Sequence, residues 1–181
     1  LTNFYPNLVV KLLPMSTEAD QRFNTAITLL GGKGVFVREL EKAILSGKAD
    51  IAVHSLKDVP SKLPEGLCID GFLKRGDPRD VLVFEKIIER ESGIDSLPYR
   101  ARVGTSSFRR QSQLLAVRPD LETLMIRGNI HTRLYQLKAR KLDAIVLASS
   151  GLQRLGLSTK HVALSTSEML PAGGQGIIVI E

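Results

Sequence analysis

Short apolar runs alternate with amphipathic segments along the first third of the chain. Residues 8–15 and 49–55 are apolar runs of strand length, and the first of them predicts a buried strand. Between them, residues 35–48 carry apolar side chains at helical spacing, and Gly47 is a plausible helix stop. Residues 16–30 show no clear period and predict a loop. The order of strand, helix and strand predicts a parallel sheet.

The rest of the chain repeats this alternation. "SGKADIAVHSLKD" and "ARKLDAIVLASSG" share a basic helix end, an Asp and a β-rich apolar strand that reaches a Ser. This weak internal duplication predicts two similar α/β lobes with a cleft between them. The further strands are expected at 67–73, 81–87, 102–104, 122–126 and 142–150, and the further helices at 108–117 after a small-residue turn, at 130–141 and from 151 onward.

Composition restricts the class of protein. The chain has 181 residues, of which 43% are hydrophobic and 24% charged, as is typical of a folded soluble protein. No apolar run approaches the ~20 residues of a membrane span, and the N-terminus lacks a signal pattern. One cysteine, Cys68, permits no disulfide framework. We therefore expect a cytoplasmic protein without a membrane partner.

The formal charge of +6 favours an anionic partner. Nucleic acid, an anionic membrane surface and a small polyanionic ligand all fit that charge. Aromatic residues make up only 5% and Trp is absent, so stacking platforms for single strands are scarce. A nucleic-acid partner depends on charge alone, and we expect none.

Polar and basic residues follow the predicted strands, where ligands bind in parallel α/β sheets. "GTSS" offers hydroxyl groups and a helix start, although a capped helix without any ligand explains it too. Arginine forks grip carboxylates and phosphates, although pairing with acidic residues of the same chain is the alternative. The residues in question are Ser55, Lys57, Asp58, Thr105, Ser106, Ser107, Arg109, Arg110, Arg127, Arg133 and Arg154.

Asp58 is the candidate for chemistry, because a carboxylate in a cationic cleft stays ionised at neutral pH. It could stabilise a cationic intermediate or pass protons to a substrate, and the alternative is a structural ion pair with Lys57 at a turn. No group of His, Cys, Asp and Glu has metal-ligand spacing, so no metal is expected. No phosphate-binding loop or nucleophile elbow is present.

Six motifs stand in order along the chain: "GGKGVFVRELE", "DIAVHSLKDVP", "VGTSSFRRQSQL", "IRGNIHTRL", "LASSGLQRLGL" and "LPAGGQG". In sequence and in order they resemble the porphobilinogen deaminase (hydroxymethylbilane synthase) family. The likeness runs from about residue 8 to residue 181, and six motifs in the right order make a chance match untenable.

The resemblance implies an α/β fold with two periplasmic-binding-protein-like lobes, mixed and mainly parallel sheets, and a hinge. It implies lobe 1 at 1–73 plus 178–181, lobe 2 at 79–171, and hinge segments at 74–78 and 172–177. The implied activity is a transferase reaction that joins four porphobilinogens, with loss of ammonia each time, into hydroxymethylbilane on the path to haem. A monomer acting on a small molecule is expected.

The resemblance also implies roles for individual residues. Asp58 matches the catalytic aspartate, and Lys57 matches a lysine that contacts carboxylates. Asp20 and Lys33 match residues of an active-site loop. The hydroxyl residues Ser55, Thr105, Ser106 and Ser107 match hydrogen-bonding positions, and the arginines Arg109, Arg110, Arg127, Arg133 and Arg154 match those that bind acetate and propionate side chains.

The chain departs from the family at several points. It starts after the family's "R-x-S-x-LA" segment, and it stops at Glu181, before the third domain whose cysteine carries a covalent dipyrromethane. Cys68 is not expected to carry this cofactor. We therefore expect little or no turnover from these 181 residues alone. A two-lobe anion- or solute-binding module without catalysis is the alternative function.

Overall fold

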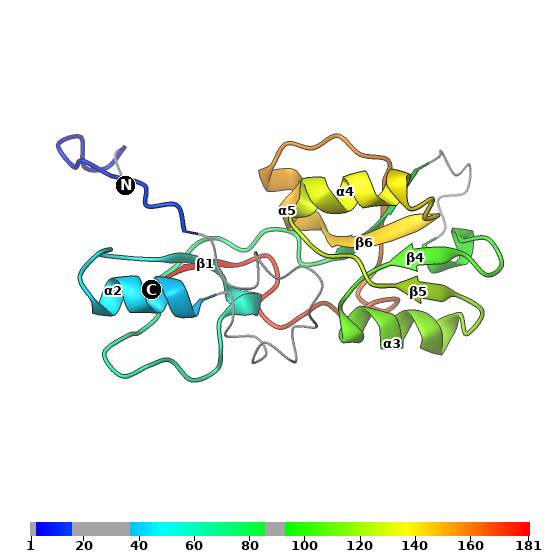
Figure 1. The fold of residues 1–181 in the computed structure, drawn as a ribbon, viewed down its shortest axis with the longest axis horizontal. Coiled ribbons are helices and arrows are strands. Elements are labelled where there is room, and N and C mark those ends of the chain that lie inside the picture. The colour runs from blue at the N-terminus through cyan, green and yellow to red at the C-terminus, as the bar shows by residue number, and fades with distance from the viewer. Residues whose placement is uncertain (1–2, 16–36, 86–92) are drawn as a thin grey trace.

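Two β-sheets lie at opposite ends of an elongated molecule (Figure 1). The computed structural model describes residues 3–15, 37–85 and 93–181 of the 181-residue chain. The predicted loop at 16–30 and the start of the predicted helix at 35–48 lie outside the described residues. Within the described residues, no helix is long and apolar enough to cross a membrane.

The first sheet has three strands in the order β1-β8-β2, and both pairs are antiparallel. Its elements are β1 (Val53–Ser55), β2 (Gly71–Phe72) and β8 (Ile178–Ile180), with α2 (Arg38–Leu45) beside them (Figure 1). His54 of β1 faces the core, and its Nε2 lies 3.0 Å from Glu181 Oε2, with both side chains buried. The central strand thus comes from the far end of the sequence.

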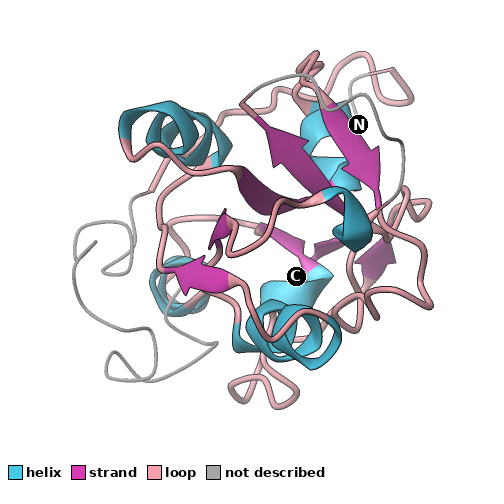
Figure 2. Ribbon diagram, turned by 90° about the vertical axis from the view of Figure 1, so that its right-hand side faces the viewer, coloured by secondary structure: helices cyan, strands magenta, loops and turns pink. Residues whose placement is uncertain are grey.

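The second sheet has five strands in the order β5-β4-β6-β3-β7. β4 pairs in parallel with β5 and with β6, whereas β3 pairs antiparallel with β6 and β7. Figure 2, which looks along the long axis from this end, shows helices on either side of its strands. The elements are β3 (Asp80–Phe84), β4 (Arg102–Gly104), α3 (Phe108–Val117), β5 (Glu122–Leu124), α4 (Ile130–Ala139), β6 (Ala144–Ala148), α5 (Ser149–Arg154) and β7 (His161–Ala163).

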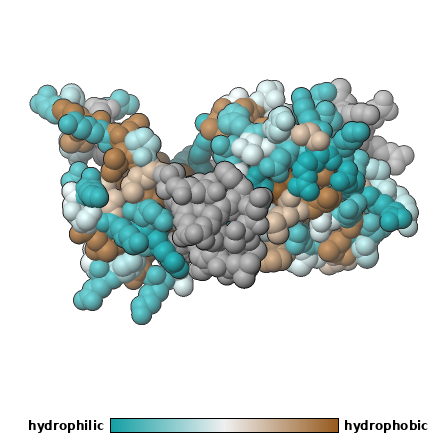
Figure 3. Space-filling view, in the orientation of Figure 1, coloured by the Kyte–Doolittle hydropathy of each residue, from teal (hydrophilic) through white to brown (hydrophobic). Residues whose placement is uncertain are grey.

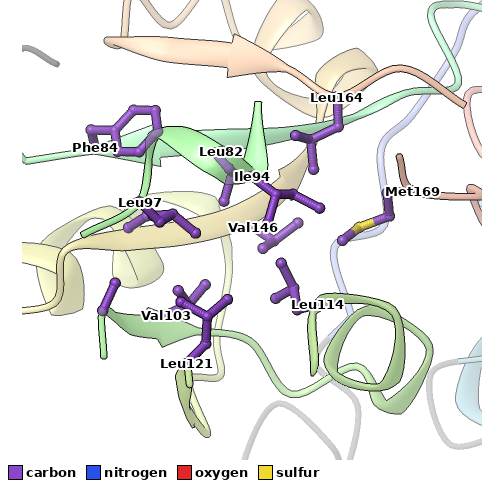
Figure 4. Close-up of a cluster of buried hydrophobic side chains, with 12 residues drawn as sticks. Leu82, Phe84, Ile94, Leu97, Val103, Leu114, Leu121, Val146, Leu164 and Met169 are labelled. Atoms are coloured by element: carbon purple, nitrogen blue, oxygen red, sulfur yellow. The ribbon is translucent and has the colours of Figure 1, made fainter. Parts of the chain in front are cut away.

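Both faces of the second sheet are buried. Successive side chains of a strand point to opposite faces, so Leu82 and Val81 enter different clusters. The Leu82 cluster packs against Leu114 of α3 (Figure 4), and the Val81 cluster packs against Leu137 of α4 and Leu152 of α5. Burial on both faces explains why the runs that form β3 and β6 are continuously apolar rather than alternating.

Two chain segments connect the sheets (Figure 1), and we call them the crossing segments: 73–79 between β2 and β3, and 164–177 between β7 and β8. The Gly76 N–H donates to Gly176 O at 2.9 Å, and Arg75 Nε donates to Gln175 O at 3.0 Å. Gln175 Nε2 donates in return to Pro78 O at 2.6 Å. The crossing segments therefore form one hydrogen-bonded unit between the lobes.

The α/β class with mixed sheets is confirmed, but parallel pairing is limited to β4 and its two neighbours among the described strands. The crossing segments explain this. β3 begins beside the last residue of β6, where Asp80 pairs with Ala148, and so must run against it. β8 likewise begins beside the end of β1, where Ile178 pairs with Ser55.

The strand predicted at 8–15 is wrong. These residues are all exposed and form no strand, with Val9 79% and Leu12 90% exposed. Figure 3 shows hydrophobic residues, in brown, at the surface of the end of the molecule where the N-terminal segment lies. An apolar run becomes a strand only where a neighbouring strand accepts its backbone hydrogen bonds, and the Leu8 N–H instead donates to a local turn partner, Tyr5 O, at 3.0 Å.

We predict that Gly176→Ala destabilises the fold by about 2 kcal/mol, because Gly176 has a φ of +91° that L-residues avoid. An added Cβ would also lie 2.6 Å from Gly76 O. Gly173→Ala is the matched control in the same crossing segment, since its added Cβ meets no atom within 4 Å. Urea denaturation of both variants measures the difference, and equal stabilities would contradict this account of the crossing.

Candidate functional site

The strand ends of both sheets meet at the crossing segments. β4, β5 and β6 are parallel, so their carboxyl ends share one edge of the second sheet, and Asp80 lies at that edge because β3 runs the other way. In the first sheet the carboxyl end of β1 pairs with the start of β8, directly after a crossing segment. The polar residues that follow these strands therefore come from two lobes but face one region.

Lys57 and Asp58 lie in a 3-10 turn (Leu56–Asp58) that follows β1 directly. The turn is fixed to the crossing by the Leu56 N–H, which donates to Ile177 O at 3.0 Å. Leu56 also packs so tightly on Gly174 that a Cβ there would lie 2.7 Å from its Cγ. The turn and the crossing segment thus hold the adjacent cation and carboxylate where the two lobes meet.

The charge of Lys57 is partly withdrawn from water. Burial lowers the pKa of Lys57 below its usual value. The Asp58 and Asp80 carboxylates oppose this shift, and the Arg110 and Arg133 guanidinium groups add to it. Lys57 makes no hydrogen bond or ion pair within the part of the chain that the structure describes. It is therefore a desolvated cation near one carboxylate from each lobe, Asp58 and Asp80, and near two arginines of the second lobe.

Arg133 shares this environment from the other lobe. Its Nε donates to Gly128 O at 2.8 Å, which fixes the guanidinium beside the N-terminus of α4. Burial lowers the pKa of Arg133, as do the charges of Arg110 and Arg127, whereas Asp58 raises it. The structure thus brings together four of the six predicted basic residues, Lys57, Arg110, Arg127 and Arg133, with the predicted catalytic carboxylate of Asp58.

A fully buried carboxylate, Asp80, lies behind these cations. Arg110 Nε and Nη2 donate to Asp80 Oδ1 at 3.2 and 2.7 Å, and Gln175 Nε2 donates to the same oxygen at 2.9 Å. Arg109 Nη2 lies 2.8 Å from Oδ2. Arg110 Nη1 reaches Val146 O at 3.0 Å. One carboxylate therefore joins the first turn of α3, both crossing segments and the second sheet.

The pKa of Asp80 agrees with these contacts. Burial raises the pKa of Asp80, but the charges and hydrogen bonds of Arg110, Gln175 and Arg109 outweigh it, so this pKa lies below its usual value. Removing one partner of a buried ion pair typically costs about 3–5 kcal/mol, because an uncompensated charge remains. Intrachain pairing, which the sequence left open, thus holds for Arg109 and Arg110.

Arg154 contacts the second crossing segment rather than the group of cations near Asp58, which is formed by Lys57, Arg110, Arg127 and Arg133. Its Nη2 donates to Gly176 O at 2.6 Å, an oxygen that also accepts from the Gly76 N–H. This places the C-terminal end of α5 on the unit that connects the lobes.

The predicted hydroxyl residues make their contacts within their own lobes. Thr105 is fully buried, and its Oγ1 accepts from the Ser107 N–H at 3.2 Å. Ser106 Oγ donates to Ile126 O at 2.5 Å. Ser107 occupies the N-cap position without a side-chain cap. Ser55 pairs through its backbone with Ile178.

Some predicted positions lie elsewhere. Asp20 and Lys33 lie outside the described residues. Cys68 is an exposed free thiol on the segment before β2. Within residues 3–15, 37–85 and 93–181, no group of three or more His, Cys, Asp or Glu residues could hold a metal.

Sequence analysis missed Asp80 and Gln175. Asp80 stood in "KRGDPRD", which has the composition of a linker, and Gln175 stood in a glycine-rich stretch. One signal was available: an acidic residue directly before the apolar run "VLVF" is costly unless cations surround it.

A family model described as "Porphobilinogen deaminase, dipyromethane cofactor binding domain" matches residues 2–181. This chain belongs to the porphobilinogen deaminase family. It is 49% identical to the porphobilinogen deaminase of Lawsonia intracellularis, 50% to that of Xanthomonas axonopodis pv. citri and 49% to the chloroplastic enzyme of Euglena gracilis. All of the chain is covered in each case, with 58%, 59% and 38% of those proteins. It thus spans about half the length of the relatives it matches.

Solved structures of solute-binding proteins resemble this chain only weakly. An ancestral cationic amino acid solute binding protein aligns with a TM-score of 0.41 and 17% identity, over 72% of this chain and 55% of that one. The alkanesulfonate-binding protein of Xanthomonas axonopodis pv. citri, bound to MOPS, aligns with a TM-score of 0.36 and 16% identity, over 78% and 50%.

The positive charge of the cations near Asp58 matches the negative charge of the dipyrromethane cofactor that the family description names. A dipyrromethane made from two porphobilinogens carries four carboxylates, and each needs a cation or several donors when it leaves water. Lys57 and Arg133 are desolvated cations at the junction of the lobes, and their charges need a counter-ion more than surface charges do.

We predict that Lys57→Met stabilises the fold at pH 7, because it removes a desolvated cation that repels Arg110 and Arg133. The folded pKa of Lys57 is lowered, so the unfolded chain binds more protons and wild-type stability rises with pH up to about 10.4. The advantage of the variant should therefore vanish near that pH. Urea denaturation at pH 7 and at alkaline pH measures it, and a destabilised variant at pH 7 would contradict it.

Proposed function

We propose that the protein carrying this chain is a porphobilinogen deaminase that condenses four porphobilinogens, one at a time, into hydroxymethylbilane. The observation that carries this proposal is the meeting of Asp58 with Lys57 and Arg133 at the junction of two lobes. A growing chain of dicarboxylate pyrroles is a polyanion, and it requires several cations around one acidic group.

The basic residues bind the carboxylates of the substrate. Lys57 and Arg133 supply point-charge and fork contacts to substrate carboxylates, and Arg127 extends the cationic group along the loop before α4. Arg109, Arg110 and Arg154 line the crossing segments, where they bind further acetate and propionate side chains. The hydroxyl groups of Ser55, Thr105, Ser106 and Ser107 add hydrogen bonds at the strand ends.

Asp58 performs the electrostatic step. Ammonia leaves the aminomethyl group of porphobilinogen, and the positive azafulvene-like species that remains is stabilised by the carboxylate. The free α-carbon of the acceptor pyrrole attacks the methylene carbon, a C–C bond forms and the α-carbon loses its proton. A dipyrromethane, when bound, supplies the first acceptor pyrrole.

The crossing segments act as the hinge between lobe 1 (1–73 and 178–181) and lobe 2 (79–171), with 74–78 and 172–177 as the moving parts. Lobe opening admits one porphobilinogen at a time, and Asp20 and Lys33 match residues of the family's active-site loop. The protein acts as a cytoplasmic monomer on a small-molecule substrate.

We predict that Asp58→Asn lowers porphobilinogen turnover at least 100-fold in the protein carrying this sequence, because the developing cation loses its counter-ion. Porphobilinogen binding should change by about threefold or less, since the arginines remain. Steady-state assays and calorimetry measure the two effects.

The exposed Asp70 provides the matched control, because Asp70→Asn makes the same chemical change on the first lobe, beside Ile180 at the end of β8 that is remote from the crossing segment. Undiminished turnover in Asp58→Asn would refute the proposed chemistry. Carboxylate binding without any turnover in the unsubstituted protein would instead favour a solute-binding module.

A further inference from the structure

Asp80 is a buried charge to which the family chemistry gives no task. Its side chain is fully buried, and it sits at the first residue of β3, where the crossing segment enters the second sheet. Its two oxygens contact three side chains from two elements: Arg110 and Arg109 of α3, and Gln175 of the second crossing segment. A carboxylate shared so widely fixes the relative positions of everything that binds it.

The arginine pair needs such a fixed partner. Arg109 and Arg110 are adjacent cations in the first turn of a helix, where the helix dipole disfavours positive charge. Arg110 also lies within electrostatic range of Lys57 and Arg133. Without a counter-ion, these like charges would push the two guanidinium groups toward water and away from the strand ends.

The two arginines are held in different ways. The Arg110 side chain is 7% exposed, and three of its N–H groups are bound to Asp80 and to Val146 O. The Arg109 side chain is 26% exposed, with one Nη on Asp80 and the other on Leu170 O. Asp80 therefore secures Arg110 inside the protein and leaves Arg109 partly open at the surface of the site.

We propose that Asp80 is a positioning residue, whose carboxylate holds Arg109 and Arg110 in the geometry that receives ligand carboxylates and ties them through Gln175 to the second crossing segment. This inference rests on the proposed function for the ligand. Gln175 and Arg110 share Asp80 Oδ1, so a change in the crossing that withdraws the amide also changes the hold on the guanidinium.

Asp80→Asn tests the proposal, because positioning and simple charge predict opposite changes in the affinity for anions. If Asp80 acted only as a charge near the site, its removal would make the site more positive and strengthen anion binding. Positioning predicts the reverse: at least tenfold weaker binding of porphobilinogen and of the simpler probe 1,2,3-propanetricarboxylate. Calorimetry at fixed ionic strength, on folded protein well below its unfolding temperature, measures both affinities.

Asp77→Asn is the matched control, because Asp77 lies in the same crossing segment and pairs with the exposed Arg79 instead. Its affinities should stay within about twofold of wild type. A second readout is the alkaline limb of ligand binding, which follows the loss of the Lys57 charge. Asp58, Asp80, Arg110 and Arg133 face Lys57, and removing Asp80 should move that limb to lower pH.

Equal or tighter binding by the Asp80→Asn variant overturns this inference alone. Failure of the unsubstituted protein to bind either probe overturns it together with the proposed function. If the variant does not fold, Gln175→Met decides the question, because it keeps the Asp80 charge and removes the amide donor. At least threefold weaker binding by Gln175→Met supports the coupling, and undiminished binding refutes it.

Discussion

A buried carboxylate is stable only where cations and hydrogen-bond donors surround it, and Asp80 imposes this condition on the centre of the molecule. It is met by two arginines of α3 and by Gln175 of the second crossing segment. The contacts of these three side chains organise the rest of the site. The arginines cannot leave the strand ends without exposing an uncompensated charge, and the crossing cannot move away without losing a hydrogen bond to it.

The antiparallel entry of strands explains why the site lies between the lobes. A strand that arrives through a crossing segment must begin at the edge where its neighbours end, as β3 does beside β6 and β8 beside β1. The carboxyl ends of strands in both sheets therefore face the same crossing. Lys57 and Asp58 follow one sheet and Arg133 follows the other, which is how residues far apart in sequence come to share one electrostatic environment.

The sequence allowed most of the second sheet to be predicted. The continuous apolar runs of β3 and β6, and the helical spacing of α4, are strong local signals. The first sheet was harder, because β1 and β2 are only three and two residues long and pair with a strand more than a hundred residues away. Residues 8–15 carried the same apolar signal as a strand but pair with no strand in the part of the chain that the structure describes, and periodicity alone cannot show whether a partner is present. Among site residues, Asp58 and the arginines could be found at strand ends, whereas Asp80 was hidden in a turn-rich segment.

The most direct test of this account is a crystal structure of the protein carrying this sequence with a dipyrrole or porphobilinogen bound. The account predicts pyrrole nitrogens on Asp58 and ligand carboxylates on Lys57, Arg133, Arg109 and Arg110, while Arg110 keeps its contacts with Asp80. A ligand that lies away from the crossing segments would contradict it. So would a complex in which Arg110 leaves Asp80 to bind the ligand, because the buried carboxylate could not then be the fixed point of the site.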